Sequence, residues 1–231
     1  MKVMLRTTIV LFLFVSFSSM FLQQTKRVVF FGDSITQAGV QPTGYITRIG
    51  ETLKEKGIGN AYELIGAGIG GNKIYDLYLR MDDDVLAKNP DVVFIWVGVN
   101  DVWHKQSFGT GTDPDKFEKF YHAIIKKLQA KKIRVILVTP AAIGEKTDFT
   151  NQQDGDLNKY SQIIRDIAVK DNCELVDLRK IFLDYNLKNN PTNKESGILT
   201  VDRVHLNDKG NQLVADVMVK VLANVKEVTL Q

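Results

Sequence analysis

The sequence predicts a three-layer α/β/α sandwich built on a five-stranded parallel sheet. Five short apolar segments alternate with segments whose apolar residues recur at helical spacing. Such alternation is typical of a parallel sheet that carries helices on both faces and right-handed crossovers. The 231 residues are 44% hydrophobic and 25% charged, a composition that supports one substantial core. We find no internal repeat, low-complexity segment or long linker in the sequence, so we expect a single α/β domain.

The first 24 residues have the pattern of a targeting segment. Lys2 and Arg6 precede an apolar run over residues 7–22 that carries small hydroxyl side chains near its end. This order is typical of a secretory signal peptide. No Ala-x-Ala motif marks a cleavage point, so an uncleaved membrane anchor stays open as the alternative. We therefore expect an exported protein, periplasmic or secreted, whose folded domain covers residues 25–231.

Five segments have the composition of strands in a parallel sheet. Strands buried on both faces appear as continuous apolar runs rather than as alternating ones. The strongest such run is Val92–Val97, and Val28–Phe31 resembles it. The expected strands cover residues 28–31, 62–65, 92–97, 134–138 and 174–176.

Five further segments have helical periodicity. In the clearest of them, Asp113 and Pro114 supply a capping residue and a first-turn proline ahead of a regular apolar stripe, as expected at a helix N-terminus. Lys56-Gly57 gives a suitable end to an earlier helix. The expected helices cover residues 44–56, 73–80, 113–130, 156–170 and 208–222.

Charge and cysteine content exclude several classes of partner. The formal net charge is +3, and because Lys2 and Arg6 lie in the N-terminal segment the rest of the chain carries +1. This balance gives no reason to expect a nucleic-acid partner. Cys173 is the only cysteine in the sequence, which excludes an internal disulfide and a multi-cysteine metal site. We expect a membrane contact only if the N-terminal segment is retained.

Glycine and polar residues follow three of the expected strands, and a fourth polar segment precedes the last expected helix. In an open α/β sheet, ligands bind beyond the carboxyl ends of the strands. Ester hydrolysis by serine needs a hydroxyl, a base oriented by a carboxylate, and donors for the developing oxyanion. Residues of those types occur together in these segments, which are 32–34, 66–72, 98–101 and 202–205.

These segments resemble the four motif blocks of the SGNH, or GDSL-type, hydrolase family. The matching residues are Gly32-Asp33-Ser34, Gly68 to Asn72, Gly98 to Asp101 and Asp202 to His205, in the family's order. The resemblance runs from residue 28 to the end of the chain. It implies a flavodoxin-like fold and hydrolysis of carboxylic esters, often acetyl or other short acyl groups on sugars or alcohols. The second block departs from the pattern, since Gly66 stands where the family often has Asn.

The resemblance also implies roles for five residues. Ser34, at an expected helix N-terminus, is the nucleophile, His205 is the general base, and Asp202 holds the His205 ring in one tautomer. The oxyanion hole consists of the Ser34 and Gly71 amides and the Asn100 side chain. This mechanism requires neither a metal nor a cofactor.

Some neighbouring residues have competing interpretations. His104 is a rival base because it follows the third strand, with Asp101 as its only nearby acid. His122 lies within the expected helix 113–130 and is interpreted as a surface or half-buried residue. Asp33 is expected to stabilise a turn, and Trp103 is expected either to line the pocket or to pack. Each polar segment, taken alone, also fits an ordinary turn or helix cap.

Two other functions deserve comparison with the hydrolase. Gly66-x-Gly68-x-x-Gly71, followed by Asp91, fits the fingerprint of a dinucleotide-binding oxidoreductase. That fingerprint belongs after the first strand, whereas here it follows the second, and Asp91 precedes its strand. A non-catalytic glycan-binding module is the second alternative, but such a module has no need of a serine with its own base.

The segments expected to form the rim of the site limit the substrate. Residues 105–113, 141–155 and 186–200 are polar and contain few large apolar side chains. A shallow, hydrated site of this kind suits short acyl groups on a carbohydrate better than a long lipid chain. A lysophospholipid, another lipase-type substrate and a small-alcohol ester stay open as alternatives.

Overall fold

The computed structural model describes residues 25–223, and the expected targeting segment lies outside these residues. Five strands form one sheet in the order β2-β1-β3-β4-β5, and every neighbouring pair is parallel. The expected five-stranded parallel sheet is confirmed. The strands are β1 (Lys26–Gly32), β2 (Tyr62–Gly68), β3 (Val92–Trp96), β4 (Arg134–Val138) and β5 (Glu174–Val176).

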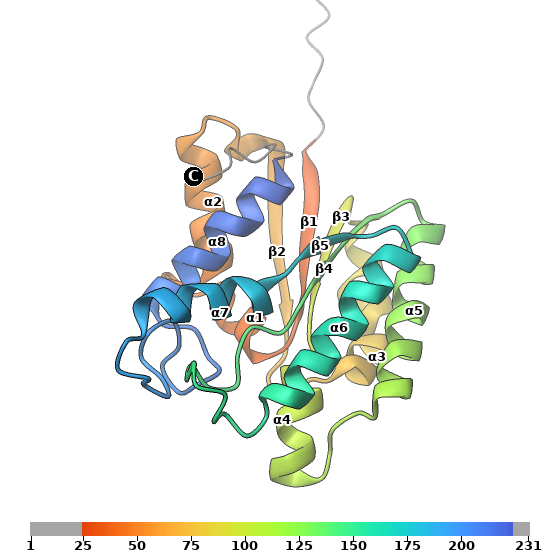
Figure 1. Ribbon diagram of the computed structural model, residues 1–231. Helices are drawn as coiled ribbons and strands as arrows, with labels where there is room; N and C mark the ends of the chain where they lie inside the picture. The colour runs from red at the N-terminus through yellow and green to blue at the C-terminus, as the bar shows by residue number, and fades with distance from the viewer. Residues whose placement is uncertain (1–24, 224–231) are drawn as a thin grey trace, which may run out of the picture.

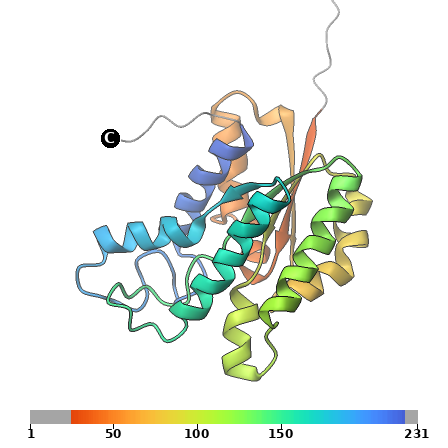
Figure 2. The same ribbon diagram turned by 45° about the vertical axis from the view of Figure 1, so that its right-hand side comes forward.

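Helices cover both faces of this sheet, which gives the three layers (Figures 1 and 2). The sheet grows from β1 toward β2 in one direction and from β1 through β3 toward β5 in the other. Because crossovers are right-handed, the two directions place their helices on opposite faces. The helices are α1 (Ser34–Gly39), α2 (Tyr45–Glu55), α3 (Ile74–Asp84), α4 (Val99–Phe108), α5 (Pro114–Ala130), α6 (Asp154–Lys170), α7 (Leu178–Asn189) and α8 (Asp208–Leu222), with short 3-10 turns at Gly59–Ala61 and Leu86–Lys88.

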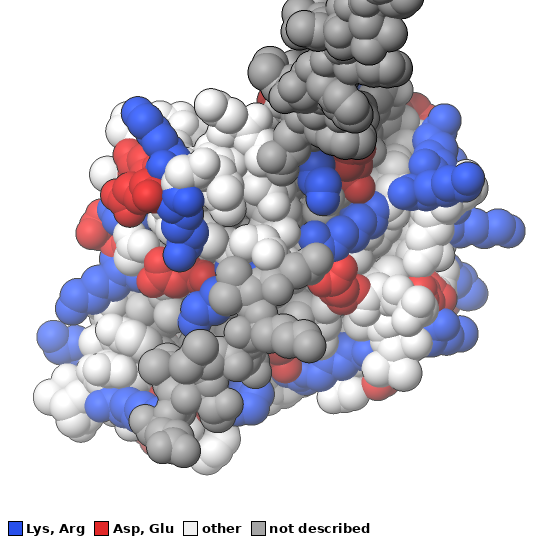
Figure 3. Space-filling view, turned by 90° about the horizontal axis from the view of Figure 1, so that it is seen from above, with Lys and Arg blue, Asp and Glu red and all other residues white. Residues whose placement is uncertain are grey.

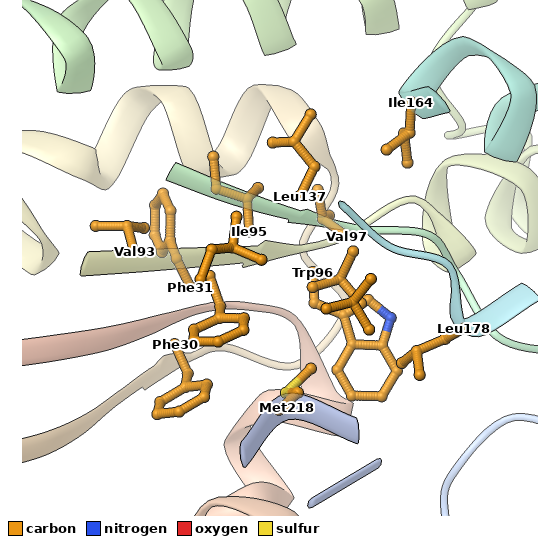
Figure 4. Close-up of a cluster of buried hydrophobic side chains, with 14 of the residues drawn as sticks. Phe30, Phe31, Val93, Ile95, Trp96, Val97, Leu137, Ile164, Leu178 and Met218 are labelled. Carbon is orange, nitrogen blue, oxygen red and sulfur yellow. The ribbon is translucent and has the colours of Figure 1, made fainter. Parts of the chain in front are cut away.

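The core fills both sides of the central strands (Figure 4). Phe30 packs edge-on against Tyr45 of α2, with 5.8 Å between ring centroids. The next residue, Phe31, lies under the Arg80 guanidinium of α3 at 4.6 Å. Consecutive strand residues thus contact helices of opposite layers, and both rings are buried. This two-sided burial explains why β1 and β3 appear in the sequence as continuous apolar runs.

Two helices and one strand end differ from the expectation. Helices α4 and α7 were not expected, and in both of them polar residues make up half of the sequence or more. Strand β2 continues through Gly66 and Gly68, which pair with Phe30 and Gly32, so the turn begins later than expected. Two glycines of the possible dinucleotide fingerprint therefore lie inside a strand. They do not form the strand-to-helix turn that a dinucleotide site requires.

The amino-terminal end of the sheet carries charges of both signs (Figure 3). Arg27 pairs with Glu63 at 3.0 Å, and Arg134 pairs with Glu174 at 2.6 Å. Lysine, arginine and acidic side chains are interspersed over the part of this face that is visible. Between residues 25 and 223, no helix is both long enough and apolar enough to cross a membrane.

Gly68 is expected to be essential for the seating of α1 on β2. A Cβ at Gly68 would lie 2.1 Å from the backbone nitrogen of Gln37 and 2.5 Å from the carbonyl carbon of Thr36. Gly68→Ala should therefore lower the free energy of unfolding by about 2–3 kcal/mol, because the obstacle is backbone. Urea unfolding followed by circular dichroism measures this change.

Gly50→Ala is the matched control for this substitution. Gly50 lies within α2, and a Cβ there would meet only Leu64 Cδ1, at 3.6 Å. Alanine in a helix should raise the free energy of unfolding by about 0.5–1 kcal/mol. A Gly68→Ala protein as stable as the wild type would contradict the packing described for α1.

Candidate active site

Ser34 occupies the first position of α1, directly after β1. The Asp33 carboxylate caps this helix by accepting a hydrogen bond from the Ile35 amide at 3.0 Å, and the Asp33 carbonyl accepts one from Gln37 at 2.9 Å. Asp33 thus stabilises the turn, as expected. The helix start leaves the Ser34 amide without an acceptor inside the helix.

Asp202, His205 and Ser34 form a continuous row of hydrogen bonds. His205 Nε2 is 2.9 Å from Ser34 Oγ, although the two residues are 171 positions apart in the chain. On the other side of the ring, His205 Nδ1 is 2.7 Å from Asp202 Oδ2. The other carboxylate oxygen of Asp202 accepts the amides of Val204 at 3.1 Å and His205 at 2.8 Å. The structure therefore brings together the three residues expected to share the site.

The environment of Asp202 keeps its side chain negatively charged. Partial burial alone would raise the pKa of Asp202, but hydrogen bonds from the His205 ring and from two backbone amides outweigh it and lower the pKa below its usual range. An ionised carboxylate at Nδ1 favours the tautomer whose proton is on that nitrogen. Nε2 is then left as an acceptor for the Ser34 hydroxyl.

The turn after β2 leaves one backbone amide unused. Between Gly70 and Ile74, every amide except that of Gly71 donates a hydrogen bond to a residue that the structure describes. Gly71 itself has φ of +76°, a conformation that favours glycine. The acceptors are Gln37 Oε1 for Gly70 (2.9 Å), the Ile69 carbonyl for Asn72 (3.3 Å), Asp76 Oδ2 for Lys73 (2.9 Å) and Asp101 Oδ1 for Ile74 (3.2 Å).

The same turn lies against Ser34 and Asn100. A Cβ at Gly70 would be 3.9 Å from Ser34 Cβ. Asn100, in the first turn of α4, donates from Nδ2 to the Asn72 carbonyl at 3.1 Å, which uses one of its two amide hydrogens. The Ser34 amide, the Gly71 amide and the second Asn100 hydrogen have no acceptor among the residues described. These are the three donors expected from the sequence.

His104 does not form a comparable arrangement. Its ring packs against Trp103 and Phe108, with centroids 5.7 and 5.1 Å away. The Asp101 carboxylate expected to assist it instead accepts the Ile74 amide. Burial, followed by the positive charge of Lys73, lowers the pKa of His104.

His122 has carboxylate partners on a different part of the molecule. Its Nδ1 is 2.5 Å from Asp171 Oδ2, and its Nε2 is 3.4 Å from Glu118 Oε1. His122 is half-buried on α5, in agreement with the expectation. It resembles His205 in having an aspartate partner, but no serine hydrogen-bonds to it among residues 25–223.

Arg80 is a component of the site that the sequence does not reveal. From α3, its Nη2 donates to the Gly32 carbonyl at 2.8 Å and to the Ala67 carbonyl at 2.9 Å. Its Nε donates to Asn72 Oδ1 at 2.7 Å. Arg80 thereby joins the end of β1, the end of β2 and the turn that contains Gly71. A single arginine on a helix matches no sequence motif, so its contacts with these three segments could not be predicted from the sequence.

Glu145 is a second such component. Its buried carboxylate accepts the amides of Ile198 at 2.9 Å, Leu199 at 2.6 Å and Thr200 at 3.0 Å. These amides lie just ahead of Asp202 in the chain. Glu145 therefore holds in place the start of the segment that carries Asp202 and His205. Residues 141–145 were expected at the rim of the site, but they are buried. The cause is this contact with the segment 195–203.

Two aspartates near the site are buried without a cation bonded to them. Burial raises the pKa of Asp33 and of Asp101 to about 7. In Asp101 the hydrogen bond from Ile74 and the nearby Thr112 hydroxyl oppose this shift only in part. Both carboxyls therefore exchange a proton within the pH range in which enzymes are usually assayed.

Comparison with protein families agrees with the resemblance predicted from the four motifs. The model of the GDSL-like lipase/acylhydrolase family matches residues 30–213. This match includes Ser34, Gly71, Asn100, Asp202 and His205.

Individual relatives are acetylxylan esterases. One from Geobacillus stearothermophilus is 28% identical over 206 residues, which are 82% of this chain and 90% of the relative. The crystal structure of the acetyl xylan esterase AlAXEase is 69% identical, with a TM-score of 0.83 over 87% of this chain and 100% of that one. Axe2, an acetylxylan esterase from Geobacillus stearothermophilus, is 25% identical, with a TM-score of 0.74 over 85% of this chain and 94% of that one.

Asp101→Asn should make stability less dependent on pH. The unfolded carboxyl titrates near 3.8 and the folded one near 7, so its stabilising contribution is complete below pH 4 and is lost as the pH rises to 7. Between pH 5 and pH 8 the wild type should lose about 2 kcal/mol through this residue. The variant, which cannot ionise there, should not lose it. Urea unfolding at both pH values measures the difference.

Asp83→Asn is the control for this comparison, because Asp83 is exposed on the same helix that Asp101 contacts. It should follow the wild-type pH dependence. An Asp101→Asn protein that loses as much stability as the wild type between pH 5 and pH 8 would show that the Asp101 carboxyl is not protonated in the folded state.

Proposed function

Because the chain belongs to the GDSL-like lipase/acylhydrolase family and is therefore a carboxylic ester hydrolase, we propose that it removes acetyl groups from a carbohydrate by serine catalysis. The observation that carries this proposal is the row of hydrogen bonds from Asp202 through His205 to Ser34. A serine with its own oriented base is of use to an acyl-transfer enzyme and of no use to a glycan-binding module.

In the first half of the reaction, Ser34 Oγ attacks the ester carbonyl. His205 Nε2 accepts the hydroxyl proton as the new C–O bond forms. The ring becomes positively charged, and the ionised Asp202 stabilises it at Nδ1. When the tetrahedral intermediate collapses, His205 returns the proton to the departing sugar oxygen. The acetyl group stays on Ser34 as an ester.

Three donors stabilise the negative charge of the tetrahedral intermediate. They are the Ser34 amide, the Gly71 amide and the side-chain amide of Asn100. Their positions are fixed before the substrate binds, since Arg80 and Asn100 both hydrogen-bond to Asn72, the residue that follows Gly71. Donors that need no rearrangement contribute most to catalysis of this kind.

In the second half, water releases the acetyl group from Ser34. His205 Nε2 accepts a proton from the water while its oxygen attacks the acyl carbon, and the same donors bind the second oxyanion. Collapse returns the proton to Ser34 Oγ and liberates acetate. Each turnover therefore consumes one ester and one water and restores the serine. The residues present supply every proton transfer.

The relatives and the surface of the site support an acetylated carbohydrate as substrate. Two similar proteins are acetylxylan esterases, one of them 69% identical, so acetylated xylan is the preferred candidate. The segment between α4 and α5 and residues 146–153 are polar, which suits a hydrated polymer. The expected export signal in residues 1–24 would bring the enzyme to a substrate outside the cell.

His205→Ala should lower kcat for p-nitrophenyl acetate by at least about a thousandfold, because Ser34 loses its base. Asn100→Ala should lower it by about a hundred- to a thousandfold through the loss of one oxyanion donor. His122→Ala is the matched control, since it removes the other histidine that pairs with an aspartate. It should leave kcat unchanged. Full activity in His205→Ala would exclude the proposed base.

A substrate panel tests the carbohydrate assignment. We expect acetate release from acetylated xylan, and we expect kcat/KM for p-nitrophenyl esters to fall as the acyl chain lengthens from two to eight carbons. The physical reason is that the polar segments 109–113 and 146–153 offer a long acyl chain few apolar side chains. A preference for the eight-carbon ester would instead indicate a lipase or lysophospholipase. Hydrolysis of small-alcohol acetates without any release from glycans would indicate a small-ester hydrolase.

A further inference from the structure

Three rings on α4 lie beside the candidate active site and have no part in the mechanism above. Trp103 and His104 have centroids 5.7 Å apart, and His104 and Phe108 are 5.1 Å apart in an edge-to-face arrangement of 79°. We call these three residues the α4 ring cluster. Trp103 packs partly against the core, whereas 69% of the Phe108 surface is exposed.

The cluster directly adjoins the expected oxyanion hole. A Cβ at Gly71 would be 3.8 Å from His104 Cε1, so the imidazole is in van der Waals reach of the glycine whose amide is unused. The same helix carries Asn100 in its first turn, four residues before His104. Figure 1 shows α4 projecting beyond the carboxyl ends of the strands. Helix α4 therefore borders the site on the side of the turn that contains Gly71.

Phe108 is the outermost ring and has no aromatic partner beyond His104 among the residues described. It is the last residue of α4, and Gly109, with φ of +68°, ends the helix behind it. Single exposed apolar side chains are common and mean little alone. Here, however, the Phe108 ring packs edge-on against the His104 ring. The His104 ring in turn lies next to Gly71, so the two rings form a continuous surface that begins beside the candidate active site.

The chemistry of this surface fits a sugar chain. A pyranose has C–H faces that pack on aromatic rings and hydroxyls at its edge that need hydrogen-bond partners. The lowered pKa of His104 leaves its ring neutral at neutral pH, with one nitrogen that donates and one that accepts.

We infer that the α4 ring cluster is a glycan-binding subsite, in which His104 contacts the acetylated sugar and Phe108 packs on the adjacent sugar of the same chain. This inference rests on the proposed function and adds to it that the enzyme recognises at least two consecutive sugars. It also names Phe108 as a residue that determines specificity. Small acetyl esters do not reach Phe108, and their hydrolysis does not depend on it.

Phe108→Ala tests the subsite. With an acetylated xylo-oligosaccharide of four or more sugars, kcat/KM should fall about tenfold, mainly through KM, which corresponds to the loss of one aromatic contact of about 1.4 kcal/mol. With p-nitrophenyl acetate, kcat and KM should both stay at the wild-type values. Phe108→Tyr, which keeps a ring, should restore oligosaccharide activity. Val169→Ala is the control, because Val169 is an equally exposed apolar residue on α6, away from the site, and it should change neither substrate.

The outcomes separate this inference from the proposed function. If the wild type hydrolyses acetylated oligosaccharides and Phe108→Ala does so equally well, the subsite is wrong and the function stands. If the wild type hydrolyses p-nitrophenyl acetate but no acetylated glycan, both are wrong. If sedimentation shows that Phe108→Ala changes the oligomeric state while oligosaccharide KM is unchanged, Phe108 is a contact between copies of the chain, and the subsite is again overturned.

Discussion

The hydrogen bond between Ser34 and His205 depends on a buried carboxylate that belongs to neither residue. Ser34 is held by a strand and a helix, but His205 lies in a segment between α7 and α8 with no regular secondary structure beyond one isolated bridge, Thr200 to Leu206. Such a segment has buried amides that need acceptors. Glu145 supplies two oxygens to three of them. The amides in turn make burial of the charged group tolerable, since an unpaired buried carboxylate is costly.

The turn around Gly71 is held in a similar way, but here a positively charged side chain, Arg80, donates hydrogen bonds to carbonyl groups. A guanidinium buried among carbonyls is favourable only when its donors are used. Arg80 comes close to this condition: it donates to Gly32, Ala67 and Asn72 and to Asp84 at 2.7 Å, which uses four of its five N–H donors. The Gly32 carbonyl at the end of β1 accepts the Ile69 amide at 3.3 Å as well as Arg80, and the Ala67 carbonyl near the end of β2 accepts Arg80 at 2.9 Å. The Arg80 side chain therefore links the ends of β1 and β2 and also holds the turn around Gly71.

Sequence patterns predicted the parts of this structure that follow from residues close together in the chain. Strand β3 (Val92–Trp96) is buried along its whole length, and its apolar run predicted this. Ser34 and Asn100 follow strands, so the parallel topology alone placed them at one edge. Glu145 and Arg80 could not be found in this way, because their roles come from contacts with residues 53 and 48 positions away. Helix α4 was missed for a related reason: only its first four residues are buried, so it lacks the apolar periodicity that marks a packed helix.

The two aspartate–histidine pairs show why such a pair alone does not make a site. His122 has carboxylates at both ring nitrogens, Asp171 at 2.5 Å and Glu118 at 3.4 Å. Both ring nitrogens of His122 therefore face carboxylate oxygens, and neither faces a hydroxyl that could act as a nucleophile. His205 has one carboxylate and one hydroxyl, so its second nitrogen can accept. The difference lies in what faces Nε2, and that is decided by the position of α1 and by the segment that Glu145 holds against it.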